Sequence, residues 1–287
     1  MAGLTLSHSW WLSFWEIFIG KLNLTLLLWG VVLERFVRFA VRVGLIVVLL
    51  ALILVGYFSY LKFIKIGGPL EVFSATACGL NESCQDQVVV LKGTIEPNSA
   101  EETFSALQEY LSRNPVRDTV CLDSRGGDVD ASVKLASMIH REGLNTCVLS
   151  SYKISDGSDF KSYCQSSCVW VSLAGKENIL YDGAVLGFHA ARKQDYFGNI
   201  IGIDCDGFEK FKELIGSVVK EKGRQDQLVD LLKWSFDQGS GPETTDCRAQ
   251  QVQKRYQYFT KIKGASGTDL QGCKLERQVI GWTCNRG

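Results

Sequence analysis

A serine and a histidine that lie close together in the sequence could carry out acyl-transfer chemistry. Ser166 and Ser167 begin a short apolar run, and His189 follows a second apolar segment at 184–188. A hydroxyl becomes an effective nucleophile when an imidazole takes its proton, and the same imidazole can then protonate the leaving group. The stretch 164–190 therefore contains the two groups that a serine hydrolase requires.

The chain contains three histidines, and their positions separate their roles. His8 precedes the apolar segment that we expect to cross a membrane, so it is not part of the domain that contains the serines. His140 falls near the end of a predicted helix, where a cation complements the helix dipole. His189 is thus the candidate base. Position alone leaves a structural role open for it, and leaves the role of helix N-cap open for the serine.

Two adjacent glycines could complete such a site. Gly126 and Gly127 follow the predicted strand 119–122 almost directly. Glycine adopts positive φ at little cost, so a turn here can point backbone N–H groups outward. Such groups can stabilise the oxyanion of an acyl-transfer reaction. An ordinary turn is the alternative interpretation.

The N-terminal part of the chain is typical of a membrane anchor. Segment 43–61 contains 19 residues without a charge, which is long enough for a helix to cross about 30 Å of hydrocarbon. Three arginines precede this segment and two lysines follow it. This bias predicts a cytoplasmic N-terminal side and an external domain. Segment 10–33 is apolar and rich in tryptophan; it is interpreted as a second span that forms a hairpin, or as an amphipathic anchor.

Cysteine usage indicates the compartment of the remaining chain. All ten cysteines lie between Cys78 and Cys284, after the apolar segment. An even number confined to this side favours disulfides in an oxidising compartment, with reduced buried thiols as the alternative. The net charge of zero excludes a broad electrostatic attraction to nucleic acid.

Strands and helices alternate after residue 86. Short β-branched runs at 87–91, 119–122 and 145–150 are separated by segments with helical periodicity. This rhythm predicts an α/β fold with a parallel sheet. The predicted organisation comprises a membrane anchor at 1–65, a linker at 66–85, an α/β domain at 86–240 and a cysteine-containing extension at 241–287.

Three motifs, taken in this order, resemble the ClpP/crotonase superfamily and its ClpP-like serine proteases. They are DSRGG at 123–127, a serine that opens a helix within 166–175, and a strand that ends in Phe188-His189. The Cys-x-Ser-x-Cys frame at 164–168 is similar to that of uncharacterised periplasmic or membrane-anchored bacterial relatives. The resemblance covers roughly 86–240 and implies a ClpP/crotonase-like parallel β-sheet core with flanking helices.

The resemblance also implies roles for individual residues. Ser166 is then the nucleophile, His189 is the general base, and the N–H groups of Gly127 and Ser167 form the oxyanion hole. The triad acid is expected after the following helices. Asp237 lies there, and Asp246 is the alternative.

The sequence departs from the family pattern at three places. Arg125 replaces a proline in the glycine motif, Cys164 and Gln165 replace the usual small residues before the serine, and the surroundings of Asp237 match poorly. A Ser-Lys dyad with Lys176 or Lys193 is therefore an alternative mechanism. A zinc site at the two cysteines of the frame is disfavoured, because three intervening residues are not the usual ligand spacing.

The expected function is that of a serine peptidase in the bacterial inner membrane, with its soluble domain in the periplasm, that hydrolyses peptide bonds without ATP. No cofactor or metal is expected. The expected partners are a peptide or unfolded polypeptide and the lipid bilayer, with a possible homo-oligomer and no nucleic acid. A catalytically inactive ClpP-like scaffold, or a peptide-binding protein of the cell envelope, is the alternative.

Overall fold

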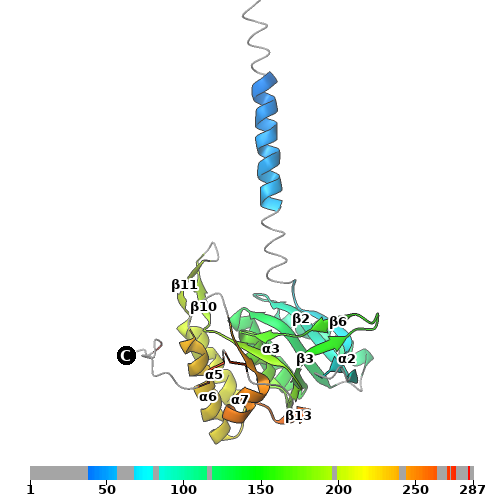
Figure 1. Ribbon diagram of the computed structural model, residues 1–287, viewed down its shortest axis with the longest axis vertical. Coiled ribbons are helices and arrows are strands. Elements are labelled where there is room, and N and C mark those ends of the chain that lie inside the picture. Colours follow the sequence, from blue (N-terminus) through cyan, green and yellow to red (C-terminus); the bar gives the residue numbers. More distant parts are fainter. Residues whose placement is uncertain are drawn as a thin grey trace, which may run out of the picture. The chain divides into compact units, whose positions relative to one another are not determined.

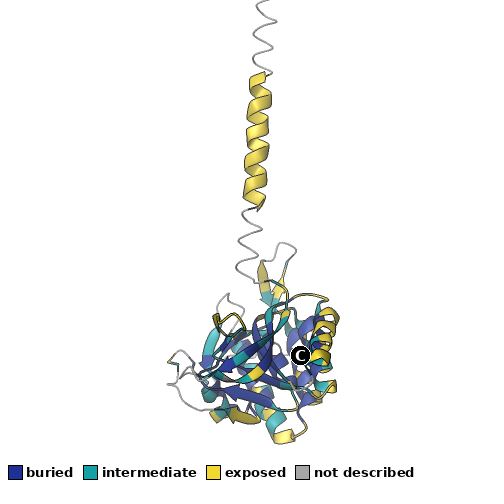
Figure 2. Cartoon of the chain, turned by 90° about the vertical axis from the view of Figure 1, so that its right-hand side faces the viewer, coloured by how far each residue is buried: buried dark blue, intermediate teal, exposed yellow. Residues whose placement is uncertain are grey.

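A computed structural model describes residues 38–56, 68–79, 84–114, 118–195, 199–238, 244–263, 270–271, 273–275 and 284. The chain divides into two compact units, Met1–Lys65 and Ile66–Gly287. The described part of the first unit is the helix Arg38–Gly56, whose residues are exposed throughout (Figure 2). This helix is long and apolar enough to cross a membrane. It includes residues 43–56 of the predicted span 43–61; the end of that span and the segment 10–33 lie outside the described residues.

The second unit is built on a mixed sheet of eleven strands. Its central strands run parallel, as predicted from the alternation of strands and helices. They are β2 (Cys84–Ile95), β3 (Thr119–Gly127), β4 (Asn145–Val148), β8 (Asn178–Tyr181) and β13 (Lys261–Lys263).

The sheet divides at β3. The first half of β3 pairs with β4, whereas its Ser124 pairs with β7 (Cys164–Gln165). On its other side, β7 runs parallel to β9 (Val185–Phe188). The division therefore places three groups on one branch of the sheet: the glycine pair at the end of β3, the serine after β7 and the histidine after β9.

Antiparallel strands complete the edges of the sheet, and two of them lie outside the predicted α/β domain 86–240. The predicted linker 66–85 contains β1 (Glu71–Cys78), which pairs with both β2 and β5 (Ser151–Lys153). The predicted extension 241–287 supplies β13 and also β12 (Thr245–Arg248), which pairs with β9. Both segments are thus integral to the sheet. The edge beyond β5 is β6 (Asp159–Lys161).

Helices and a projecting ribbon surround the sheet (Figure 1). The main apolar core packs helices against β2, β3 and β9, and a smaller cluster around Tyr152 covers the opposite face. The ribbon consists of β10 (Arg192–Gln194) and β11 (Ile200–Ile203). The helices are α2 (Ala100–Arg113), α3 (Val129–Arg141), α4 (Ser167–Val171), α5 (Cys205–Val218), α6 (Lys222–Asp237) and α7 (Ala249–Tyr256), with a 3₁₀ turn at Ser172–Ala174.

All ten cysteines form disulfides, in agreement with the prediction of an oxidised domain. The pairing, which the sequence could not provide, places one bond around the candidate nucleophile. The pairs are Cys78–Cys84, Cys121–Cys147, Cys164–Cys168, Cys205–Cys284 and Cys247–Cys273.

Candidate active site

Ser166 occupies the sharp turn between β7 and α4. Its backbone has φ 57° and ψ −129°, a conformation that residues other than glycine rarely adopt. Such backbone strain persists only where the surrounding structure enforces it, and it is concentrated at functional sites. The hydroxyl makes no capping bond to α4, so the structure does not show the N-cap role that position alone allowed. Ser166 is half-buried, whereas Ser167 is buried; access therefore favours Ser166.

Three constraints hold Ser166 in this conformation. The Cys164–Cys168 disulfide closes a short loop around it. Its N–H group donates to the carbonyl of Gly187 at 2.8 Å. The preceding Gln165 also pairs with Gly187 in the β7–β9 ladder. Because Gly187 lies two residues before His189, the same strand positions both candidate catalytic groups.

The glycine turn, Gly126-Gly127 at the end of β3, lies directly against Ser166. A Cβ atom on Gly126 would lie 2.7 Å from the Cβ of Ser166 and 2.9 Å from the backbone nitrogen of Ser167. Gly126 also has φ 87°, so only glycine fits here without strain. The N–H group of Gly126 donates to the hydroxyl of Ser124 at 3.0 Å.

The two backbone groups predicted for the oxyanion hole flank this contact. At the end of the β2–β3 ladder, Gly127 pairs with Ile95, and the N–H group of Asp128 donates to the carbonyl of Ile95 at 2.8 Å. Ser167 is the first residue of α4, and first-turn N–H groups have no acceptor within their helix. Both N–H groups therefore belong to segments that border Ser166. Their role in stabilising an oxyanion stays a prediction.

His189 is half-buried at the end of β9. Its Nδ1 atom lies 2.6 Å from the carbonyl oxygen of Ala190. This contact suits the tautomer that carries hydrogen on Nδ1, which leaves Nε2 as the proton acceptor. Burial lowers the pKa of His189 below its ordinary value, and the positive charge of Arg192 lowers it further, while the Ala190 carbonyl acts in the opposite direction. The imidazole is therefore neutral at pH 7, as a general base must be.

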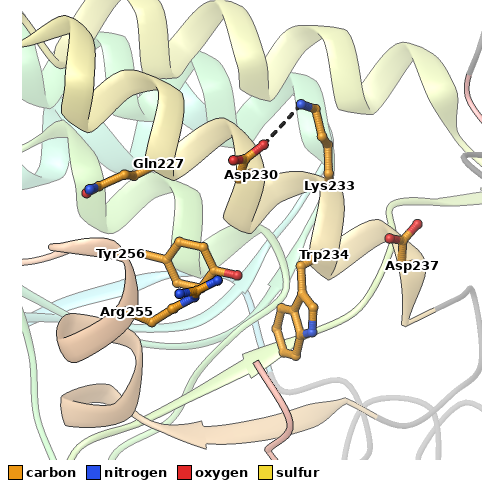
Figure 3. Close-up of a pocket in the computed structure, with 7 residues that line it drawn as sticks. All are labelled: Gln227, Asp230, Lys233, Trp234, Asp237, Arg255 and Tyr256. Carbon is orange, nitrogen blue, oxygen red and sulfur yellow. Dashed lines mark hydrogen bonds and ion pairs between the residues drawn. The ribbon is translucent and has the colours of Figure 1, made fainter. Parts of the chain in front are cut away.

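The structure places Asp237 at the C-terminal end of α6, in a pocket of about 290 Å³ (Figure 3). Ser235 on the same helix donates to the carbonyl of His189 at 3.2 Å. Two positions along a helix differ by about 200°, so Asp237 projects from the face roughly opposite Ser235. Among the described residues, no hydrogen bond or ion pair joins Asp237 to His189. The pocket is lined by Gln227, Asp230, Lys233, Trp234, Asp237, Arg255 and Tyr256.

The alternative acid, Asp246, lies next to the serine turn. It pairs with Gly187 across the β9–β12 ladder. Its Oδ1 atom accepts a hydrogen bond from Thr244 at 2.8 Å and one from Gln165 at 3.3 Å. A residue two positions along the facing strand is a diagonal neighbour at about 7–8 Å, so the imidazole of His189 is within reach of Asp246 after a side-chain rotation.

Sequence reasoning missed Gln165 and Thr244, the two side chains that hold Asp246. No local signal identifies them, because 79 positions separate them in the chain and they meet only through strand pairing. Their nitrogen and oxygen atoms also contact each other at 3.3 Å. Together they fix the Asp246 carboxylate beside Ser166.

The remaining predicted candidates lie elsewhere. Lys176 is exposed and follows the 3₁₀ turn, at the opposite end of the helical segment from Ser166. Lys193 is exposed on β10. The Nδ1 atom of His140 contacts the carbonyl of Ala174 at 3.1 Å, a structural role. His8 lies outside the described residues. The described residues contain no cluster suited to a metal, and the cysteines of the 164–168 frame are joined as a disulfide.

The chain matches many solved structures, but no known sequence family. No protein-family model and no curated protein matches it. Among solved structures, it is similar to a serine-to-alanine mutant of the 1510-N membrane-bound stomatin-specific protease, at 13% identity and a TM-score of 0.43, over 61% of this chain and 77% of that chain. A lysine-to-alanine mutant of that protease in complex with a substrate peptide is similar at 11% identity and a TM-score of 0.41, over 61% and 74%. Likeness at this level carries no argument, so the function has to be inferred from the site itself.

Proposed function

We propose that this chain is a membrane-anchored serine peptidase with a ClpP-like fold. One observation carries the proposal: the half-exposed Ser166 is held at a strained turn against Gly126. Its backbone N–H group donates a hydrogen bond to β9, and His189 directly follows this strand. The candidate nucleophile, the candidate base and the backbone donors lie on adjoining segments, and these groups are the minimum that acyl transfer requires.

The proposed reaction follows from these groups. Nε2 of His189 takes the proton of the Ser166 hydroxyl while Oγ attacks the peptide carbonyl carbon. The N–H groups of Gly127 and Ser167 stabilise the oxyanion. The imidazolium then protonates the leaving amine as the C–N bond breaks, which leaves an acyl-enzyme. His189 then deprotonates a water molecule, whose oxygen attacks the ester carbonyl carbon. The C–O bond to Ser166 breaks, and the imidazolium returns the proton to Oγ of Ser166.

We further propose that the domain lies in the periplasm and is tethered to the inner membrane. Five disulfides are typical of an oxidising compartment. The helix Arg38–Gly56 supplies an apolar span with arginines at its N-terminal end. A domain outside the cytoplasm cannot meet cytosolic ATP-driven unfoldases, so the proposed substrates are short or unfolded polypeptides, hydrolysed without ATP. Assembly into a homo-oligomer stays a prediction.

The pH dependence of peptide cleavage tests this function. We expect the purified full-length chain in detergent micelles to cleave unfolded polypeptides without nucleotide. The acidic limb of kcat/KM should have an apparent pKa below 6.5, because burial and Arg192 lower the pKa of His189. Activity should thus persist at pH values where an ordinary histidine is mostly protonated. Absence of cleavage, or an acidic limb that is unchanged when His189→Gln removes the base, would contradict the proposal.

A pair of variants distinguishes the two acids. We propose Asp246 as the group that orients His189, so Asp246→Asn should lower kcat by about 10²- to 10⁴-fold. Asp237→Asn, at the pocket between α6 and α7, should change kcat by less than about threefold. The measurement is kcat for one peptide with all three proteins. The reverse order of effects would assign the role to Asp237.

The inactive scaffold is the second candidate, because the described structure brings no carboxylate onto the ring of His189. Such a protein would bind unfolded peptides and release them intact. Peptide binding with no cleavage by well-folded protein, at any pH from about 5 to about 9, would favour this function.

A further inference from the structure

Arg192 lies beside the candidate base and has no ion-pair partner among the described residues. It opens β10, three residues after His189, and it is half-buried. Its charge acts on the His189 imidazole. Its Nε atom is buried without a hydrogen-bond partner, and the guanidinium forms no ion pair with the described residues. Burial lowers the pKa of Arg192, and no carboxylate among the described residues raises it.

The other half-buried arginines of the described structure are held by hydrogen bonds. Arg224 donates to the carbonyls of Gln257 and Tyr258 and to the side chain of Asn178. The Nε atom of Arg248 is also buried without a hydrogen-bond partner, but its guanidinium donates to the carbonyl of Gly183 at 2.7 Å. A buried charge without such partners is costly, and it persists where an anion from outside completes its coordination.

A second cation lies on the other segment that borders the nucleophile. Arg125 is exposed in the glycine turn, next to Gly126, whose backbone lies against Ser166. Arg125 stands where the similar family motif has a proline. Both segments that contact the candidate catalytic pair therefore carry a guanidinium, a group whose planar fork matches a carboxylate.

We propose that Arg192 binds a carboxylate of the polypeptide substrate beside His189, so that this peptidase selects acidic substrates. The carboxylate belongs either to the C-terminus of the peptide or to an aspartate or glutamate side chain. Arg192 is thus a specificity-determining residue, and Arg125 adds positive potential at the same site. This inference rests on the proposed peptidase function.

Matched peptides and variants test the inference. A defined library of unstructured peptides is first incubated with the wild-type chain, and mass spectrometry identifies the cleaved bonds. The best acidic peptide is then compared with two neutral forms, one with glutamine for glutamate and one with a C-terminal amide. These two forms distinguish the two sources of the carboxylate. Arg192→Gln is compared with Lys193→Gln, which removes the same charge from an exposed neighbour on the same strand.

The wild type should cleave the acidic peptide with a kcat/KM about 10- to 100-fold above that of one neutral form. Arg192→Gln should reduce this ratio to near one, and Lys193→Gln should retain it. Arg192→Gln should also raise the apparent pKa of the acidic limb, because a positive charge near the imidazole is lost.

Labelling of Ser166 by a fluorophosphonate at about pH 8, where the imidazole is neutral, separates the two ways of failing. Labelling of Arg192→Gln at the wild-type rate, with an unchanged preference for acidic peptides, would overturn the role of Arg192 and leave the peptidase intact. A wild type that is labelled but cleaves neutral and acidic peptides equally would also overturn the role of Arg192 and leave the peptidase function intact. Absence of labelling in the wild type would overturn the peptidase function itself.

Discussion

Ser166→Ala should lower kcat/KM for peptide cleavage by at least about 1,000-fold, which is the scale of loss when a serine nucleophile is removed. Alanine lacks the hydroxyl that would form the acyl-enzyme. The fold should survive, because the half-exposed hydroxyl makes no capping bond to α4. The measurement is cleavage of one peptide by both proteins, with circular dichroism as a check of folding.

The matched control for this variant is Ser137→Ala. Ser137 is exposed on α3, and its hydroxyl donates to the carbonyl of Val133 within the same helix, at 2.8 Å. We expect activity within about twofold of the wild type for this control. If Ser166→Ala retained activity comparable to that of the control, another nucleophile would carry out the reaction.

Gly126→Ala should abolish most of the activity through contact with the nucleophile rather than through unfolding. The new Cβ would lie 2.7 Å from the Cβ of Ser166 and 2.7 Å from the carbonyl oxygen of Gln165. Atoms do not approach so closely, so the serine turn must move away from the glycine turn. A displacement of about 1 Å at the reacting groups is enough to cost about 100-fold in rate.

Gly157→Ala provides a control for the backbone strain in this variant. Gly157 has φ 86°, close to the φ 87° of Gly126, but a Cβ there would meet no atom within 4 Å. Both variants should lose about 1–2 kcal/mol of stability from the positive φ. We expect kcat/KM to fall only for Gly126→Ala. Equal kcat/KM values for the two variants would show that the glycine turn does not shape the site.

The local parts of this site could be predicted from the sequence. A strand at 119–122, a helix that begins after Ser166 and a strand at 184–188 each have a signal within a few residues, and the structure contains all three. The strand β3 extends through Gly126 and Gly127, where the sequence predicted a turn. The parallel centre of the sheet follows from the alternation of strands and helices. The helix that is long and apolar enough to cross a membrane could be predicted from composition, and its described residues are Arg38–Gly56.

The non-local parts could not be predicted. The strand β1 follows a Gly-Gly-Pro break, and only its pairing with β2 and β5 shows that it belongs to the sheet. The position of Asp246 beside Gly187 depends on a pairing between segments that are distant in the chain. Cysteine pairing depends in the same way on the finished fold. The backbone conformation of Ser166 arises from the disulfide and the β9 contact around it, and the residue types in this segment do not predict it.

The position of a covalent adduct decides whether Ser166 is the nucleophile. The full-length chain is treated with a fluorophosphonate in detergent micelles at about pH 8, where His189 is neutral, and is then digested and analysed by tandem mass spectrometry. We expect a single adduct on Ser166 that disappears when the chain is denatured before treatment and is strongly reduced in His189→Gln. An adduct on a different residue, or no adduct on folded wild-type protein, would contradict the assignment of Ser166.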